Sequence, residues 1–192
     1  MMNGCPRWSF LTVPLLAALG CSDPVPRPAQ GNLTLSIQKP TTGTPNCPLP
    51  GKQYVVGNPD GPNSISAGDR LVDGERNASI KCSVHGNGTF TFSGTIKGSS
   101  KEADKVTFAV SGGTINADKL TGTATVSVYT PQLADTFFSA EGACTVTVIG
   151  QQVKPGSVWA SVSCASITAA STGQVCTVGD ITTFVLENCD GS

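Results

Sequence analysis

Histidine and charge are both scarce in this sequence of 192 residues. His85 is the only histidine, and 13% of the residues are charged, with 12 Lys or Arg against 13 Asp or Glu. A Ser-His-Asp or Cys-His enzyme would have to use His85, yet the sequence has no Gly-x-Ser-x-Gly nucleophile elbow. Runs of basic residues are also absent, which removes the attraction that nucleic-acid binding needs. The sequence therefore predicts no nucleic-acid partner, and we interpret His85 as an exposed residue beside a turn.

Metal-ligand spacings are missing as well. There is no Cys-x-x-Cys and no Cys/His cluster of the kind that holds zinc. The acidic segment 69–75 lacks the ligand alternation of an EF-hand and includes Arg70, with Arg76 next to it, so we interpret it as a solvated turn. The other carboxylates are scattered, and none forms an evident catalytic pair. No metal, cofactor or catalytic residue is predicted.

Long hydrophobic runs are absent. The longest apolar stretch, residues 10–19, is interrupted by Pro14, whereas a transmembrane helix needs about 20 apolar residues. The stretch follows a short polar start that carries Arg7 and ends at Gly20-Cys21. This arrangement is typical of an export signal, and it predicts a signal peptide over residues 1–20.

The end of that segment, Ala18-Leu19-Gly20-Cys21, resembles the lipobox of bacterial lipoproteins. The resemblance implies that Cys21 receives a lipid, becomes the new N-terminus after cleavage and anchors the protein to an envelope membrane. In the common bacterial sorting rule, Asp after the cysteine retains the protein at the inner membrane. Ser22 stands there instead, which favours the outer membrane. Residues 21–30 alternate prolines with other residues, and this pattern predicts an extended tether.

From residue 31 to 192 the pattern is that of strands, and helical periodicity is nearly absent. Apolar residues alternate with Thr, Ser and other polar residues, as in strands with one buried face. Clusters of Gly, Asn, Asp and Pro separate the alternating segments, which lie near 33–37, 80–84, 90–96, 106–110, 124–128, 144–148, 160–164 and 182–186. We therefore predict a single all-β domain, an antiparallel sandwich or barrel of roughly eight to ten strands.

One hairpin is predicted in more detail. If Ile80, Cys82 and Val84 lie on the same face as the phenylalanines of the next strand, a two-residue loop would break the parity. A three-residue loop over 86–88 restores it and pairs Val84 with Phe90.

Six cysteines remain after Cys5, which would be cleaved off, and Cys21, which would be lipidated. An even number in an exported domain predicts three disulfides, and six cysteines allow 15 connectivities. Chain order and the parity of neighbouring strands favour the pairs Cys47–Cys82, Cys144–Cys164 and Cys176–Cys189, the last of which would close a C-terminal hairpin.

Two aromatic residues suggest a binding surface. By strand parity Tyr129 and Trp159 face outward among Ser and Thr, where they either contact a ligand such as a sugar or cover the border of the core. The functional hypothesis that fits these features best is a non-catalytic envelope lipoprotein that binds a protein or glycan partner. The alternative is a small hydrolase acting on glycans or other polymers of the cell surface.

Overall fold

The computed structural model describes residues 25–41, 46–57, 70–99 and 104–191. Within these ranges the chain forms twelve strands and a short 3-10 helix, η1 (Glu75–Asn77). The strands are β1 (Gln30–Gln38), β2 (Lys52–Val56), β3 (Leu71–Val72), β4 (Ser79–Asn87), β5 (Thr89–Gly98), β6 (Val106–Asn116), β7 (Thr121–Tyr129), β8 (Phe137–Phe138), β9 (Cys144–Lys154), β10 (Ser157–Ala169), β11 (Val175–Val178) and β12 (Thr183–Glu187).

The predicted signal peptide, Cys21 and the start of the predicted tether lie outside the described residues. Residues 25–28 of the tether are exposed. None of the described helices has the length and hydrophobicity needed to span a membrane.

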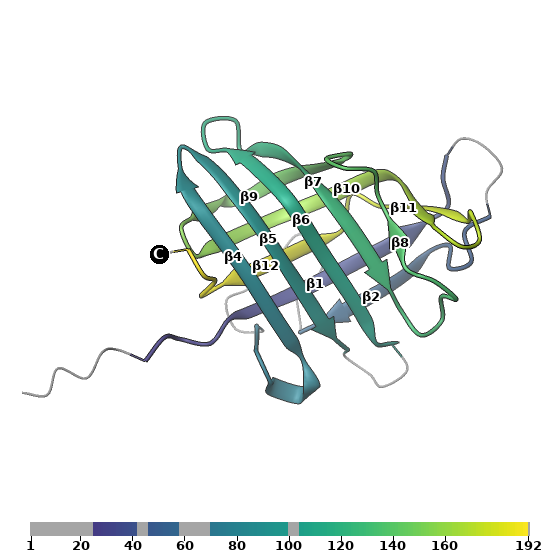
Figure 1. The fold of residues 1–192 in the computed structure, drawn as a ribbon, viewed down its shortest axis with the longest axis horizontal. Coiled ribbons are helices and arrows are strands. Elements are labelled where there is room, and N and C mark those ends of the chain that lie inside the picture. The colour runs from purple at the N-terminus through teal and green to yellow at the C-terminus, as the bar shows by residue number, and fades with distance from the viewer. Residues whose placement is uncertain (1–24, 42–45, 58–69, 100–103, 192) are drawn as a thin grey trace, which may run out of the picture.

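The strands form two layers that cross each other steeply (Figure 1). The front layer consists of β4, β5, β6 and β7, and the back layer consists of β1, β12, β10 and β9. The layers are joined because β9 and β8 each pair with both β7 and β10, and the paired strands are antiparallel. The predicted all-β antiparallel fold is confirmed, and the described strands belong to one large sheet.

The structure has more strands than the eight to ten that the sequence predicted. Two of the twelve, β3 and β8, are only two residues long. A strand of two residues contains no alternation to detect, so a period-2 pattern cannot predict it.

The core lies between the two layers and includes aromatic contacts across them. Phe184 on β12 is completely buried. Its ring centroid lies 6.0 Å from that of Phe92 on β5 and 5.9 Å from that of Phe108 on β6. Aromatic pairs at these separations contribute stability beyond the area they bury. Phe184 therefore helps to hold the back layer against the front layer.

The outer edge of β4 is covered by the C-terminal segment. The Val84 amide donates to the Asp190 carbonyl at 2.8 Å, and the Asp190 amide donates to the Cys82 carbonyl at 3.0 Å. The Gly156 amide, in the turn between β9 and β10, donates to the Val84 carbonyl at 2.9 Å. Unpaired edge strands recruit other chains and aggregate. These contacts satisfy the part of the β4 edge around Val84.

All six cysteines of the domain form disulfides, and two of the three predicted pairs are wrong. Cys144 is bonded to Cys164, its partner in the ladder between β9 and β10, which is the predicted pair. The other bonds join Cys47 to Cys176 and Cys82 to Cys189, in place of the predicted Cys47–Cys82 and Cys176–Cys189.

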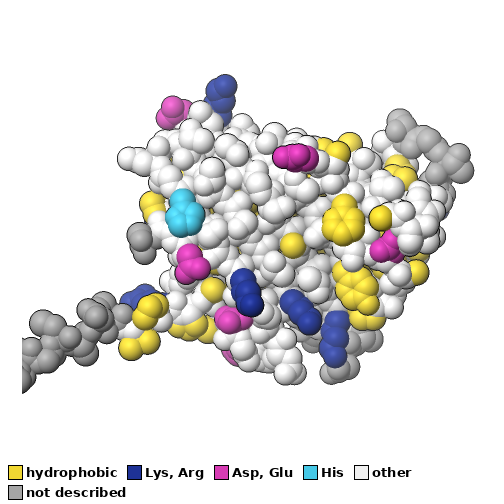
Figure 2. All heavy atoms as spheres, in the orientation of Figure 1, with side chains coloured by type: hydrophobic (Ala, Val, Ile, Leu, Met, Phe, Trp, Pro, Cys, Tyr) yellow, Lys and Arg dark blue, Asp and Glu magenta, His cyan; other side chains and the backbone are white. Residues whose placement is uncertain are grey.

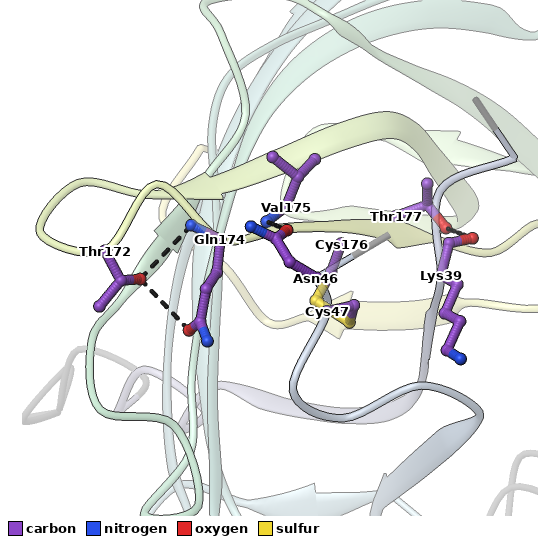
Figure 3. Close-up of a disulfide and its surroundings, with 8 residues drawn as sticks. All are labelled: Lys39, Asn46, Cys47, Thr172, Gln174, Val175, Cys176 and Thr177. Carbon is purple, nitrogen blue, oxygen red and sulfur yellow. Dashed lines mark hydrogen bonds between the residues drawn. A yellow bond between two sulfur atoms is a disulfide. The ribbon is translucent and has the colours of Figure 1, made fainter. Parts of the chain in front are cut away.

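The error comes from a C-terminal hairpin that does not exist. A Cys176–Cys189 bond would close such a hairpin, but β11 and β12 do not pair with each other. Both lie between β1 and β10, one following the other along the sheet. Cys176 and Cys189 therefore lie far apart along this position. Cys176 meets Cys47, and the Val175 amide beside it donates to the Asn46 Oδ1 at 2.7 Å (Figure 3).

The β4–β5 hairpin has the predicted facing but a different register. Val84 pairs with Phe92, whereas the sequence predicted Phe90 as its partner. Gly86 and Gly88 both have positive φ, 120° and 79°, and the ladder continues through the predicted loop to the pair Asn87–Thr89. A shift by two residues keeps every side chain on its face, so alternation alone cannot detect it.

Candidate functional site

The outer face of the front layer is polar and carries few charges. Figure 2 views this face, most of which is neither charged nor hydrophobic. Hydroxyl side chains occupy outward positions on all four strands, and Ser83 and Ser93 hydrogen bond to each other at 2.9 Å. The outward hydroxyl residues are Ser79, Ser83, Thr89, Thr91, Ser93, Thr95, Thr107, Ser111, Thr114, Thr121, Thr123, Thr125 and Ser127.

Two aromatic side chains interrupt this hydroxyl surface. Tyr129 at the end of β7 is 43% exposed, and Phe138 on β8 is 47% exposed. Phe138 is the register partner of Ser127, two residues before Tyr129, so both rings project from the same face as diagonal neighbours. Diagonal neighbours are within reach of each other when their side chains are aromatic. We call Tyr129 and Phe138 the aromatic pair.

The aromatic pair continues into two rows of side chains that run across the strands. Lys97 on β5, Thr107 on β6 and Tyr129 on β7 are successive register partners and form the first row. The second row, one step further along the strands, consists of Lys81, Thr95, Ala109, Ser127 and Phe138. Each row therefore ends in an aromatic ring and contains one lysine.

A cleft of about 580 Å³ lies beside the first row. Its lining includes Lys97, Thr107 and Tyr129 together with Arg76 and Lys105, and no acidic side chain is among its lining residues in the described chain. Arg76 has a partner, because its Nε lies 3.7 Å from the carboxylate of Glu75.

Asp104, whose neighbour in sequence lines the cleft, forms an ion pair with a residue outside the cleft. Asp104 precedes Lys105, and its Oδ1 lies 3.0 Å from the Nζ of Lys52 on β2. The hydrogen bond from this ammonium to Asp104 raises the pKa of Lys52 above its ordinary value. The negative charge of Asp104 is thus shared with a lysine that does not line the cleft.

Trp159, the other aromatic residue predicted to contact a ligand, lies on the back layer and not beside Tyr129. Its Nε1 donates to the Glu187 Oε1 at 2.7 Å, and the Arg70 guanidinium lies 4.6 Å from its ring centroid. Glu187 also pairs with Arg70 at 2.9 Å and accepts a hydrogen bond from Gln30 at 2.7 Å. Trp159 is therefore held by a polar cluster that links β1, β10 and β12.

His85 and the acidic segment 69–75, which were also considered as functional candidates, have no catalytic or metal-binding partners among the described residues. His85 is exposed at the end of β4 in a shallow depression whose described lining contains hydroxyl residues, glycines and Phe92 but no carboxylate. In the predicted acidic turn, the Asp73 Oδ1 accepts a hydrogen bond from the Ile80 amide at 2.7 Å and Glu75 accepts one from the Val72 amide at 3.2 Å. In the described chain no three His, Cys, Asp or Glu residues are placed to hold a metal ion.

Sequence reasoning found Tyr129 but missed Phe138 and the basic cleft. The doublet Phe137-Phe138 carried a usable signal, because in a strand with one buried face one of two adjacent aromatic residues must point outward. The cleft gave no local signal, since Arg76, Lys97, Lys105 and Tyr129 come from four separate parts of the chain.

Comparison with known proteins found no matching family model, no similar curated protein and no similar solved structure.

Proposed function

We propose that the protein is a non-catalytic, lipid-anchored binding module of the cell envelope that holds a glycan on the outer face of its front layer. The observation that carries the proposal is the aromatic pair. An exposed tyrosine and an exposed phenylalanine at diagonal positions of one face offer an apolar platform, and a sugar ring can stack its C–H face on such a platform. The surrounding Thr and Ser hydroxyls both donate and accept hydrogen bonds, as sugar hydroxyls do.

Binding of oligosaccharides to the full chain, expressed with its export signal, tests the proposed function. We expect an oligosaccharide array to give at least one ligand, and Tyr129→Ala with Phe138→Ala to weaken its binding about fivefold or more, because each aromatic contact contributes roughly 0.5–1.5 kcal/mol. The matched control is Ile181→Ala, which removes an apolar side chain that is 42% exposed outside the aromatic pair.

Two results would contradict the proposal. One is an array without any ligand, and the other is equal affinity of the double variant and the wild type. Mass analysis of the bound oligosaccharide after prolonged incubation separates binding from hydrolysis, because a hydrolase would shorten the chain.

Lipid anchoring makes a separate prediction. The intact mass of the membrane-extracted protein should equal that of residues 21–192 with three disulfides plus a lipid on Cys21, and reduction should expose six thiols. A mature protein without lipid, or one with free thiols before reduction, would contradict the anchor or the exported state.

A further inference from the structure

We infer that the glycan held by the aromatic pair is acidic, and that the cleft beside Tyr129 receives its anionic group. The inference rests on the proposed function and names the class of ligand. The charge of the cleft supports it, since Lys97, Lys105 and Arg76 line the cleft and no described carboxylate does. The geometry of the first row supports it independently.

The lining residues differ in how far their charge is balanced. Arg76 is paired with Glu75 at 3.7 Å. Lys97 is exposed, and no ion pair joins it to a carboxylate of the described chain. Lys97 is therefore a cation whose charge an anionic group of the ligand can balance.

The register sets the backbone spacing between Tyr129 and this lysine. Lys97 and Tyr129 lie on the same face and are separated by one strand, because Thr107 is the register partner of both. Two strand spacings amount to about 9–10 Å. A sugar chain that runs along the row would stack one ring on Tyr129, pass over the Thr107 hydroxyl and bring a group on a nearby ring to Lys97.

Lys97, at its end of the first row, favours an anionic group on the ligand. A carboxylate or a phosphate accepts hydrogen bonds from an ammonium group and neutralises it. A neutral hydroxyl gains much less there, because it carries no charge to balance the lysine. Uronic acids and sugar phosphates share the required chemistry.

The test compares a galacturonic acid hexamer with its methyl ester, which keeps the rings and removes the charge. We expect the full chain to bind the acid about fivefold to tenfold more tightly at low salt, since exposed charge pairs contribute little each and are screened by salt. Lys97→Gln should reduce this preference to less than about twofold. Lys81→Gln is the matched control, because Lys81 is an exposed lysine on the same face in the second row.

The outcomes separate this inference from the proposed function. Equal binding of acid and ester overturns the inference and leaves the proposed function in place, whereas binding of neither, together with an array that yields no ligand, defeats both. Glucose 6-phosphate and inorganic phosphate, added as competitors, distinguish a sugar phosphate from a bare anion. If poly-glutamate binds as tightly as the hexamer and Tyr129→Ala leaves that binding unchanged, the cleft is a site for acidic peptides and the inference is wrong.

Discussion

Replacing Cys82 and Cys189 together with alanine should lower the free energy of unfolding by about 4 kcal/mol, because the bond restricts a long stretch of the unfolded chain. The two residues are 107 positions apart. The loss has a second consequence in the folded state. Cys189 precedes Asp190, whose backbone covers the β4 edge at Val84, so the segment that covers the edge loses its covalent attachment.

Urea unfolding of the oxidised protein measures the first effect, and hydrogen exchange at the Val84 amide measures the second. The matched control is the double alanine variant of Cys144 and Cys164, which are 20 residues apart. Its shorter loop predicts a loss of about 3 kcal/mol. Faster exchange at Val84 is expected only for the Cys82/Cys189 variant. A loss below about 1 kcal/mol for that variant would show that the unfolded chain is already restricted between these residues.

The features that the sequence predicted correctly are those decided by neighbouring residues. Alternation placed Val84, Phe92 and Val128 inside because a strand sends successive side chains to opposite faces, whatever its partner. The same argument put Tyr129 outside. Antiparallel sheets with one wetted face follow this rule over most of their length.

The features that the sequence could not predict depend on how strands that are distant in sequence are arranged in the sheet. Cys176 and Cys189 were paired wrongly because nothing local shows that β11 and β12 lie end to end beside β1. Trp159 and Tyr129 were treated as one outward set, although one lies on each layer. Thr34 occupies a polar position of the alternating segment 33–37, where alternation predicts a wet face, and it is nevertheless buried.

The same limit applies to the candidate site. Lys97 and Tyr129, which lie in the first row beside the cleft, are brought together only by the pairing of β5, β6 and β7. Neither residue stands out from the sequence pattern of its own strand. A charged residue at the end of a strand is ordinary, and its meaning appears only when the register gives its neighbours.

Phe184→Ala should cost about 3–5 kcal/mol in the free energy of unfolding, the range for truncating a buried phenylalanine. The side chain is completely buried and contacts Phe92 and Phe108 of the opposite layer, so the variant loses buried area, leaves a cavity and breaks two aromatic contacts. Thermal and urea unfolding measure the loss. A cost below about 1.5 kcal/mol would mean that the two layers move together and fill the cavity. That result would contradict the prediction, which assumes that the layers keep their separation.

The control for Phe184 is Phe138→Ala, which removes the same side chain from an exposed position. We expect a loss of only about 1 kcal/mol, because a ring that is 47% exposed loses little buried area and leaves no cavity in the core. This contrast also bears on function. If Phe138 is dispensable for stability but needed for glycan binding, its exposure serves the ligand, whereas a cost of several kcal/mol would assign it to the packing of β8 and make its binding defect uninterpretable.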